Sequence, residues 1–449
     1  MLKRPAILLC CLALLSASAP ARPRLQQTTA KKPILIKAGR LLDVKWGQVL
    51  AGQGVLVENG RIKRVGPLAL VLRHAPKNVT VVDLGDAMLL PGLIDCHSHL
   101  FLSSDGRVDT TLKMSINERE ALAAKMAREV LEAGITTVRN LGHSGVRGDA
   151  DLRDEINAGR LAGPRILAAT RKLTPPGGQL LPGNPATEEV IKREFLPVNG
   201  ALQARQAVRQ AIKAGADVIK IVVDVGQKLL SEDEVKAIVD EAHRARLKVA
   251  AHATTEKGAA TAALAGVDSI EHGTRASDET FRLMQRKGIF LVPTDYTEAS
   301  LRQIFAANLR QSPADTADFE AWLKEYLELT PRRFQRAMKA GVKIAAGSDQ
   351  YFIYPGRTRG QATLLMLETL VSEGLPALEA IRAATVNASE LLGWQDRIGT
   401  IEAGKYADII AVEGDPLKEI KELQRVSFVM KDGVVIRNDE RGSAATLEQ

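Results

Sequence analysis

The sequence predicts an α/β protein in which a (β/α)8 TIM barrel is joined to a small β-sandwich domain formed by the N- and C-terminal segments. Helices and short apolar strands alternate through the middle of the chain, and strands of alternating polarity gather at its two ends. Polar side chains, histidines above all, follow the apolar strands of the middle part. A doubly wound open sheet is the competing fold, but it gives no reason for histidines at so many strand ends.

The two ends of the chain have the short strands and turns of an all-β domain. Residues 33–86 contain ILIKAGRLLDV, the hairpin-like GQGVLVENGRIKRVG with Asn59-Gly60 at its tip, and VTVVDL. Residues 396–440 contain ADIIAVEG and FVMKDGVVIRN, with Asp432-Gly433 as a turn. Two all-β pieces most simply combine into one domain, which assigns residues 87–395 to the barrel.

A helical segment, a glycine and a short apolar strand recur along residues 87–395. Glycine after the last helical residue is a usual helix end, and short apolar strands are typical of a parallel sheet covered on both faces. We expect helices at residues 117–133, 203–214, 232–246, 258–265, 278–287 and 331–340. The strands that follow them are ITTVRNLG, ADVIKIVV, LKVAAHA, VDSIEHG, IFLVPT and VKIAAGSD. With PGLIDCHSH and PRILAA the strands number eight, as in a (β/α)8 barrel.

The N-terminus has the layout of a secretory signal peptide. Lys3 and Arg4 precede an apolar run from Ala6 to Leu15, and Ala19-Pro20-Ala21 fits a cleavage site. We therefore expect residues 1–21 to be removed and the protein to be exported, to the periplasm or the medium; an uncleaved anchor is the alternative. Cys96 is then the one cysteine left, and we expect it to be a buried, small apolar residue.

Composition favours a soluble globular enzyme or binding protein over a nucleic-acid partner. Hydrophobic residues make up 45% and charged residues 25% of the chain, the values of an ordinary globular protein. Aromatic residues are scarce at 4%, and the net charge of +8 is scattered among acids. The expected partner is a small-molecule substrate, with no nucleic acid and no membrane after signal cleavage. A homo-oligomer is compatible with the sequence.

Polar residues lie at the ends of the predicted barrel strands, where the active sites of such barrels form. His97 and His99 are two residues apart, so on a strand both imidazoles point to one side. The other residues of this kind are Lys220 in the fourth strand, His252 and His272 closing the fifth and sixth, and Asp349 closing the eighth. Four histidines with an aspartate are hard to explain as packing, whereas zinc or a similar divalent ion suits their donor atoms.

Lys220 is the one charge in the apolar strand ADVIKIVV, and an unpaired buried ammonium is costly. A salt bridge to Asp224 or Asp349 is one interpretation. The other is reaction with carbon dioxide to give a carbamate, which is a carboxylate able to bridge two metal ions.

These motifs resemble the amidohydrolase superfamily, in the branch with imidazolonepropionase-like enzymes and bacterial Xaa-Pro or Xaa-basic dipeptidases and carboxypeptidases. The resemblance rests on PGLIDCHSHL, AGITTVRNLG, GADVIKI, the VAAHA and IEHG strand ends, AAGSD and the closing AATVNASELLG…IGTIEAGKYADIIAVEGDPL. It implies two divalent metal ions, with zinc the first expectation. His97 and His99 would bind one ion together with Asp349, His252 and His272 would bind the other, and carboxylated Lys220 and a hydroxide would bridge them.

The resemblance also implies amide-bond hydrolysis. Asp349 would act as general base and then general acid, and His143, just past the second strand, would donate to the carbonyl or oxyanion; an exposed loop histidine is the alternative. The first expectation for the substrate is a dipeptide or N-acyl amino acid with a free carboxylate. Tyr351 or Arg357, in the loop after the eighth strand, would contact it unless that loop is merely solvated.

Three features leave the activity open. The peptidase branch leads us to expect a tyrosine or arginine soon after Lys220, but Val222, Val223 and Asp224 stand there. The long connection 171–195 has the length of an active-site lid. A cyclic amide hydrolase or a deaminase on the same site is the runner-up, and an exported solute-binding protein without catalysis is the alternative from another class.

Overall fold

The computed structural model describes residues 32–104, 111, 113–179, 185–308, 313–439 and 445–446. Residues Lys32–Gln449 form one unit. The predicted signal peptide, residues 1–21, lies outside the described residues. Among the helices that the structure describes, none has the length and apolar composition needed to cross a membrane.

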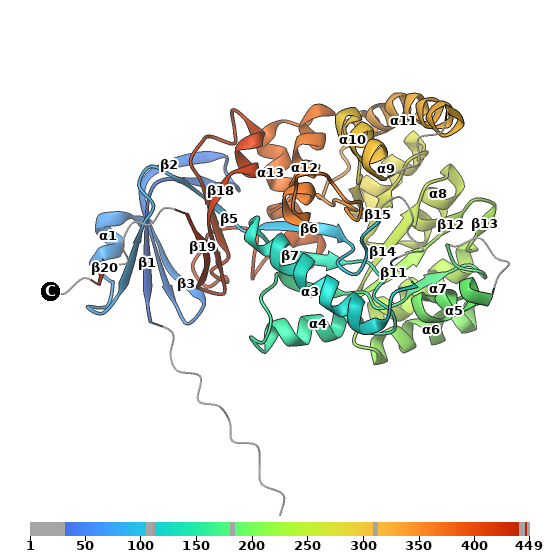
Figure 1. Ribbon diagram of the computed structural model, residues 1–449, viewed down its shortest axis with the longest axis horizontal. Coiled ribbons are helices and arrows are strands. Elements are labelled where there is room, and N and C mark those ends of the chain that lie inside the picture. The colour runs from blue at the N-terminus through green and yellow to red at the C-terminus, as the bar shows by residue number, and fades with distance from the viewer. Residues whose placement is uncertain are drawn as a thin grey trace, which may run out of the picture. The chain divides into compact units, whose positions relative to one another are not determined.

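Eight extended segments form the barrel wall and pair in parallel with their neighbours (Figure 1). In order they are β6 (Leu93–Ser98), β7 (Ile135–Asn140), β8 (Arg165–Ala168) with β9 (Lys172–Thr174), β11 (Val218–Val222), β14 (Lys248–Ala253), β15 (Ser269–His272), β16 (Phe290–Val292) and segment 343–346. The last segment closes the barrel, because Ala345 N donates to Leu291 O and Cys96 N donates to Ala346 O. The predicted barrel is therefore confirmed.

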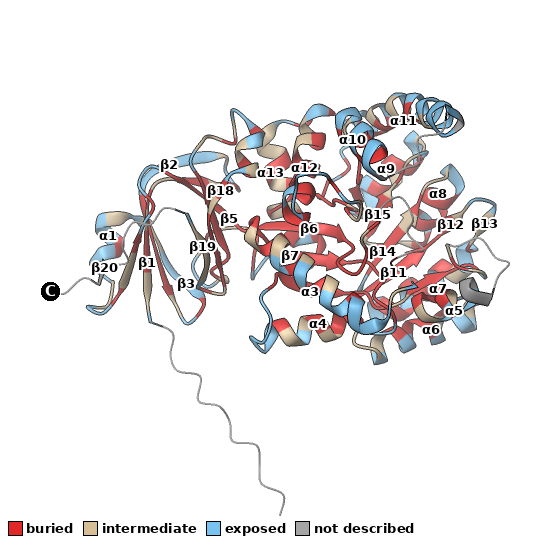
Figure 2. Cartoon of the chain, viewed as in Figure 1, coloured by how far each residue is buried: buried red, intermediate tan, exposed pale blue. Residues whose placement is uncertain are grey.

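Helices cover the barrel, and most of them have one buried and one exposed face (Figure 2). They are α3 (Ile116–Glu132), α4 (Gly148–Asn157), α5 (Pro185–Glu194), α6 (Ala201–Lys213), α7 (Glu232–Arg244), α8 (Glu256–Ala265), α9 (Asp278–Lys287), α10 (Glu298–Asn308), α11 (Pro313–Lys339), α12 (Arg359–Ser372), α13 (Ala377–Ala383) and α14 (Val386–Leu391). Gly266 and Gly288 end α8 and α9 in the left-handed conformation, with φ of 83° and 68°. The helix–glycine–strand pattern in the sequence thus marks real helix ends.

The two ends of the chain share one nine-stranded sheet, as the sequence predicts. Its strands are β1 (Ile34–Asp43), β2 (Gln48–Glu58), β3 (Arg61–Pro67), β4 (Thr80–Asp83), β5 (Met88–Pro91), β17 (Ile409–Val412), β18 (Val426–Lys431), β19 (Val434–Asn438) and β20 (Ala445–Thr446). Side chains from both ends, such as Ile36, Val55, Ile409 and Phe428, pack into one apolar core. This core is the interior of the β-sandwich.

The boundary between sandwich and barrel lies five residues later than the predicted start of the barrel at residue 87. β5 pairs with β1 and β17 inside the nine-stranded sheet, so Met88–Pro91 belong to the sandwich. The chain passes into the barrel at Gly92, where a Cβ would lie 2.2 Å from Thr136 Oγ1. This close approach separates two strands that the apolar run alone presents as one.

The connection between the seventh and eighth strands is longer and more helical than predicted. We expect a helix at 331–340, whereas α11 begins at Pro313 and is preceded by α10. Pro331 lies inside α11 rather than at its start. The additional helices lie beside α9, and α11 packs against it (Figure 1).

Candidate metal centre

The predicted ligand residues converge at the carboxyl ends of the barrel strands. His97 Nε2 lies 3.6 Å and His99 Nε2 3.1 Å from Asp349 Oδ1. The ring of His272 lies 5.3 Å from that of His97 and 4.6 Å from that of His252, between ring centres. One ligand atom each from His97, His272 and Asp349 fall within 4.8 Å of one another, a spacing that suits one metal ion.

Three of the histidines are held through Nδ1, which leaves Nε2 for a metal. His97 Nδ1 donates to Glu271 Oε2 at 2.7 Å, and His99 Nδ1 donates to the carbonyl oxygen of Gly142 at 3.2 Å. His272 Nδ1 lies 2.7 Å from Thr294 Oγ1, whose own proton goes to the carbonyl oxygen of Pro293. The hydroxyl oxygen must therefore accept from Nδ1, so that Nε2 of His272 carries no proton. Such partners orient metal-binding imidazoles.

The electrostatics keep the imidazoles neutral and the carboxylate charged. Burial lowers the pKa of His97, His99 and His252, and lowers the pKa of His272 to about 4; neighbouring cations lower the first three further. Burial alone raises the pKa of Asp349, but the adjacent His97 and His99 outweigh it and the pKa is lowered. Neutral imidazole and ionised carboxylate are the forms that bind metal ions.

Lys220 is buried in β11, and among the described residues its Nζ has no hydrogen-bond partner. Burial lowers the pKa of its ammonium to about 8. The predicted alternative of a salt bridge does not occur, because no described ion pair joins Lys220 to Asp224 or Asp349. Asp224 instead accepts from the backbone and hydroxyl groups of Thr254 and Thr255. An unpartnered buried amine among four imidazoles and a carboxylate fits a site completed by metal ions.

His143 lies inside the site and is not an exposed loop residue. Its side chain is 8% exposed, and its ring centre lies 5.2 Å from that of His99. Nε2 lies 2.6 Å from Nζ of Lys172, while Nδ1 has no partner among the described residues. Because an ammonium only donates, the proton of a neutral His143 sits on Nδ1.

Two functional neighbours escape the sequence analysis. Lys172 falls in the connection 171–195, which we expected to be a loop; the described part contains β9, α5 and β10 (Phe195–Pro197), and residues 180–184 lie outside the described residues. Glu271 stands beside His272 in the IEHG motif, and its charge in an apolar strand is the signal that marks it. It is fully buried and pairs with Arg139 at 2.8 Å.

The loop after the eighth strand places only one of the two predicted substrate contacts near the centre. The ring of Tyr351 lies 6.1 Å from that of His99. Arg357 is exposed and turns toward Gln424 and the ring of Tyr354, away from the ligand set, which corrects its predicted role. Cys96 is buried among apolar side chains, as predicted.

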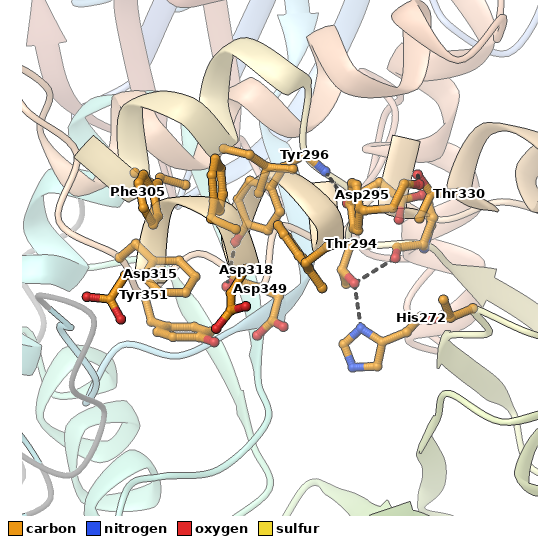
Figure 3. Close-up of a pocket in the computed structure, with 18 residues that line it drawn as sticks. His272, Thr294, Asp295, Tyr296, Phe305, Asp315, Asp318, Thr330, Asp349 and Tyr351 are labelled. Carbon is orange, nitrogen blue, oxygen red and sulfur yellow. Dashed lines mark hydrogen bonds between the residues drawn. The ribbon is translucent and has the colours of Figure 1, made fainter. Parts of the chain in front are cut away.

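A cavity of about 770 Å³ opens beside His272 and Asp349 (Figure 3). The loop after β16, the helices α10 and α11 and the loop after the eighth strand line it with Tyr296, Phe305, Phe319, Trp322, Tyr326, Tyr351 and Phe352. Phe305 and Phe319 stack with ring centres 3.9 Å apart. The chain has only nine Phe, three Trp and five Tyr, so this cavity concentrates a large share of its aromatic side chains.

A (β/α)8 barrel with imidazoles and a carboxylate at the carboxyl ends of its strands is the architecture of a metal-dependent hydrolase. The chain belongs to the amidohydrolase family, because the sequence model of that family matches residues 88–436. It is therefore a hydrolase that acts on carbon–nitrogen bonds of small molecules, in a family that binds divalent metal ions.

Several relatives match almost the whole chain. Ochratoxinase of Aspergillus niger is 30% identical over 443 residues, which cover 91% of this chain and 88% of the relative. The structure of a Xaa-Pro dipeptidase with bound methionine in the active site is 31% identical, with a TM-score of 0.77, over 90% of this chain and 99% of the other. A prolidase complexed with N-methylphosphonate-L-proline is 27% identical with a TM-score of 0.77, over 91% and 100%.

Proposed function

We propose that the protein is an exported, binuclear metal-dependent dipeptidase or carboxypeptidase. Its substrates are dipeptides or N-acyl amino acids with a free carboxylate. The observation that carries the proposal is the Nζ atom of Lys220, buried without a partner among His97, His252, His272 and Asp349. A catalytically inactive binding protein gives no reason for a buried lysine at this place.

The residues divide between two ions. His97, His99 and Asp349 would hold one, His252 and His272 the other, and a carbamate on Lys220 would supply an oxygen to each. Zinc is the first choice, because imidazole and carboxylate are its usual ligands. Bound divalent ions lower the pKa of water and polarise the scissile carbonyl.

The proton steps fall to this chain's own side chains. Asp349 would accept the proton of the attacking water and pass it to the leaving amine, as general base and then general acid. His143 donates from Nδ1 to the developing oxyanion, since its Nε2 is occupied by Lys172.

The cavity supports a substrate with a bulky apolar group. Its aromatic side chains bury flat or branched apolar groups and lie directly beside Asp349. The dipeptidase and prolidase relatives support an amide bond to an amino acid. The ochratoxinase relative supports the same class of hydrolase.

Two measurements on the purified protein test this function. Metal analysis is expected to give two equivalents in the wild type and clearly fewer in Lys220→Ala, while Lys236→Ala on the exposed face of α7 keeps both. A panel of dipeptides and N-acyl amino acids is expected to release free amino acid. Full metal and activity in Lys220→Ala contradicts the carbamate, and a silent panel favours a cyclic amide or an amine as substrate. Secretion of the full chain, and its retention after deletion of residues 1–21, tests export.

A further inference from the structure

We propose that Lys172, oriented by Gln179, is the site that binds the free carboxylate of the substrate. This inference rests on the proposed function and names the part of the site that selects amino-acid amides. The carboxylate subsite would lie across the barrel mouth from the aromatic cavity, because Lys172 belongs to the third strand and the cavity surrounds the seventh.

The strand register directs Lys172 into the barrel. Leu173 of β9 is paired with Ile221 of β11, so Lys172 and Lys220 are neighbours on adjacent parallel strands. Alternate residues of a strand point to opposite faces, and the two lysines therefore share one face. It is the face on which Lys220 lies among the predicted metal ligands. Lys172 is as buried as Lys220, with 2% of its surface exposed.

The ammonium of Lys172 is paired with neutral groups alone. Its Nζ lies 2.6 Å from Nε2 of His143 and 2.7 Å from Oε1 of Gln179. No carboxylate oxygen of the described residues forms an ion pair with it. An ammonium has three protons, so one remains for a further acceptor. Burial without a counter-ion lowers the pKa of Lys172 to about 7, and an anionic ligand hydrogen-bonded to Nζ would favour its charged form.

Neither the aromatic cavity nor Arg359 offers the carboxylate a comparable place. The aromatic cavity carries the carboxyl groups of Asp315, Asp318 and Asp349, which disfavour an anion there (Figure 3). Arg359 is buried near Tyr351, but its guanidinium donates to the carbonyl oxygens of His99, Leu102 and Gln350. The distribution of charge therefore orients the substrate, with its carboxylate toward Lys172 and its apolar acyl part toward the cavity.

The position of Lys172 also explains the departure from the peptidase pattern after Lys220. Val222, Val223 and Asp224 offer no cation there, and Asp224 is occupied by Thr254 and Thr255. A cation on the neighbouring strand reaches the same side of the site. In this chain the third strand, and not the segment after Lys220, would therefore supply the carboxylate contact.

The test compares the panel substrate that is cleaved fastest with its C-terminal carboxamide, on the metal-loaded full chain. In the wild type we expect kcat/KM for the acid to exceed that for the carboxamide by about 10- to 100-fold, the range of a charge-assisted hydrogen bond. In Lys172→Met this ratio is expected to fall to about 1, chiefly through a higher KM for the acid.

The ratio separates carboxylate binding from support of His143. A lysine that merely positions His143 affects kcat of both substrates alike, and the ratio then stays at its wild-type value. Lys172→Arg keeps the charge and is expected to keep the preference for the acid, which also guards against misfolding of the methionine variant. Lys248→Met serves as the matched control. Lys248 is the first residue of β14, so it lies at the end of the strand away from the metal ligands, and it is an exposed lysine that pairs with Asp268.

Each outcome decides one of the two proposals. An active panel with an unchanged ratio in Lys172→Met overturns the carboxylate site and leaves the proposed function standing. An active panel without preference for the acid in the wild type does the same. A silent panel overturns the proposed function, and with it the carboxylate that Lys172 would bind.

Discussion

Glu271 has two roles, to orient a metal ligand and to neutralise a buried arginine, and the variant Glu271→Gln together with a double variant separates them. Glu271 is fully buried and accepts hydrogen bonds from His97 Nδ1 at 2.7 Å and from Arg139 Nη2 at 2.8 Å. Ser269 Oγ donates to the same carboxylate. One side chain thus orients a metal ligand and neutralises an arginine that is 1% exposed.

The structure sets the size of two effects. Loss of the carboxylate leaves Arg139 charged and uncompensated, and breaking a buried ion pair in this way costs about 3–5 kcal/mol. The amide of Glu271→Gln can still present its oxygen to His97, but without the charge that raises the basicity of the imidazole. Loss of such a partner typically lowers metal affinity about 10- to 100-fold. We expect both losses in the single variant.

The assay pairs thermal unfolding of the metal-free protein with competition for metal against a chelator. The double variant Glu271→Leu/Arg139→Met replaces the ion pair by apolar side chains and is expected to recover most of the stability, as such replacements often do. Its metal affinity should stay low, because His97 still lacks its partner. Wild-type metal affinity in Glu271→Gln would falsify the role assigned to Glu271.

Three further predictions concern other parts of the molecule. Burial and the neighbouring Asp295 raise the pKa of Glu373 to about 9 from the ordinary 4.5, so the folded protein keeps a proton that the unfolded chain loses. Stability should therefore fall as the pH rises above 4.5, and Glu373→Gln should flatten the dependence of Tm on pH from about 5 to 8.5. Parallel pH profiles would contradict this. Phe319→Ala removes one ring of the stacked pair and should raise KM for N-benzoyl substrates about 10-fold more than for N-acetyl substrates. Asp349→Asn should lower kcat about 100- to 10,000-fold at saturating metal; a smaller loss assigns the proton transfer elsewhere.

The strands and ligand residues are predictable from the sequence because their signals are local. An apolar run followed by a polar residue marks the buried strand and its wet end within a few positions, as in IEHG and AAGSD. A parallel barrel then brings all such ends together, whatever their distance along the chain. His97 and Asp349 are far apart in sequence, yet Asp349 N donates to the carbonyl oxygen of His97.

The missed features depend on contacts that no local pattern encodes. The position of Lys172 follows from the pairing of Leu173 with Ile221, and its flanking residues resemble a polar loop. The sequence presents β5 and β6 as one continuous apolar strand. The break between them lies at Gly92, and its cause is a close approach to Thr136 that no neighbouring residue in the sequence indicates. Arg357 has the chemistry of a carboxylate ligand, but the direction of its side chain is set by Gln424 and Tyr354.

The chemistry and the specificity of this site come from different parts of the fold. The strand ends supply His97, His272 and Asp349, whose positions are fixed by the closed barrel and cannot shift without breaking it. Half of the residues that line the aromatic cavity lie on α10 and α11, which both belong to the connection between the seventh and eighth strands and contribute none of the predicted metal ligands. Substitutions in these helices should therefore change which amides are cleaved and leave metal binding unaltered. Substitution of Lys172 should change the requirement for a carboxylate without altering the preference for the acyl group.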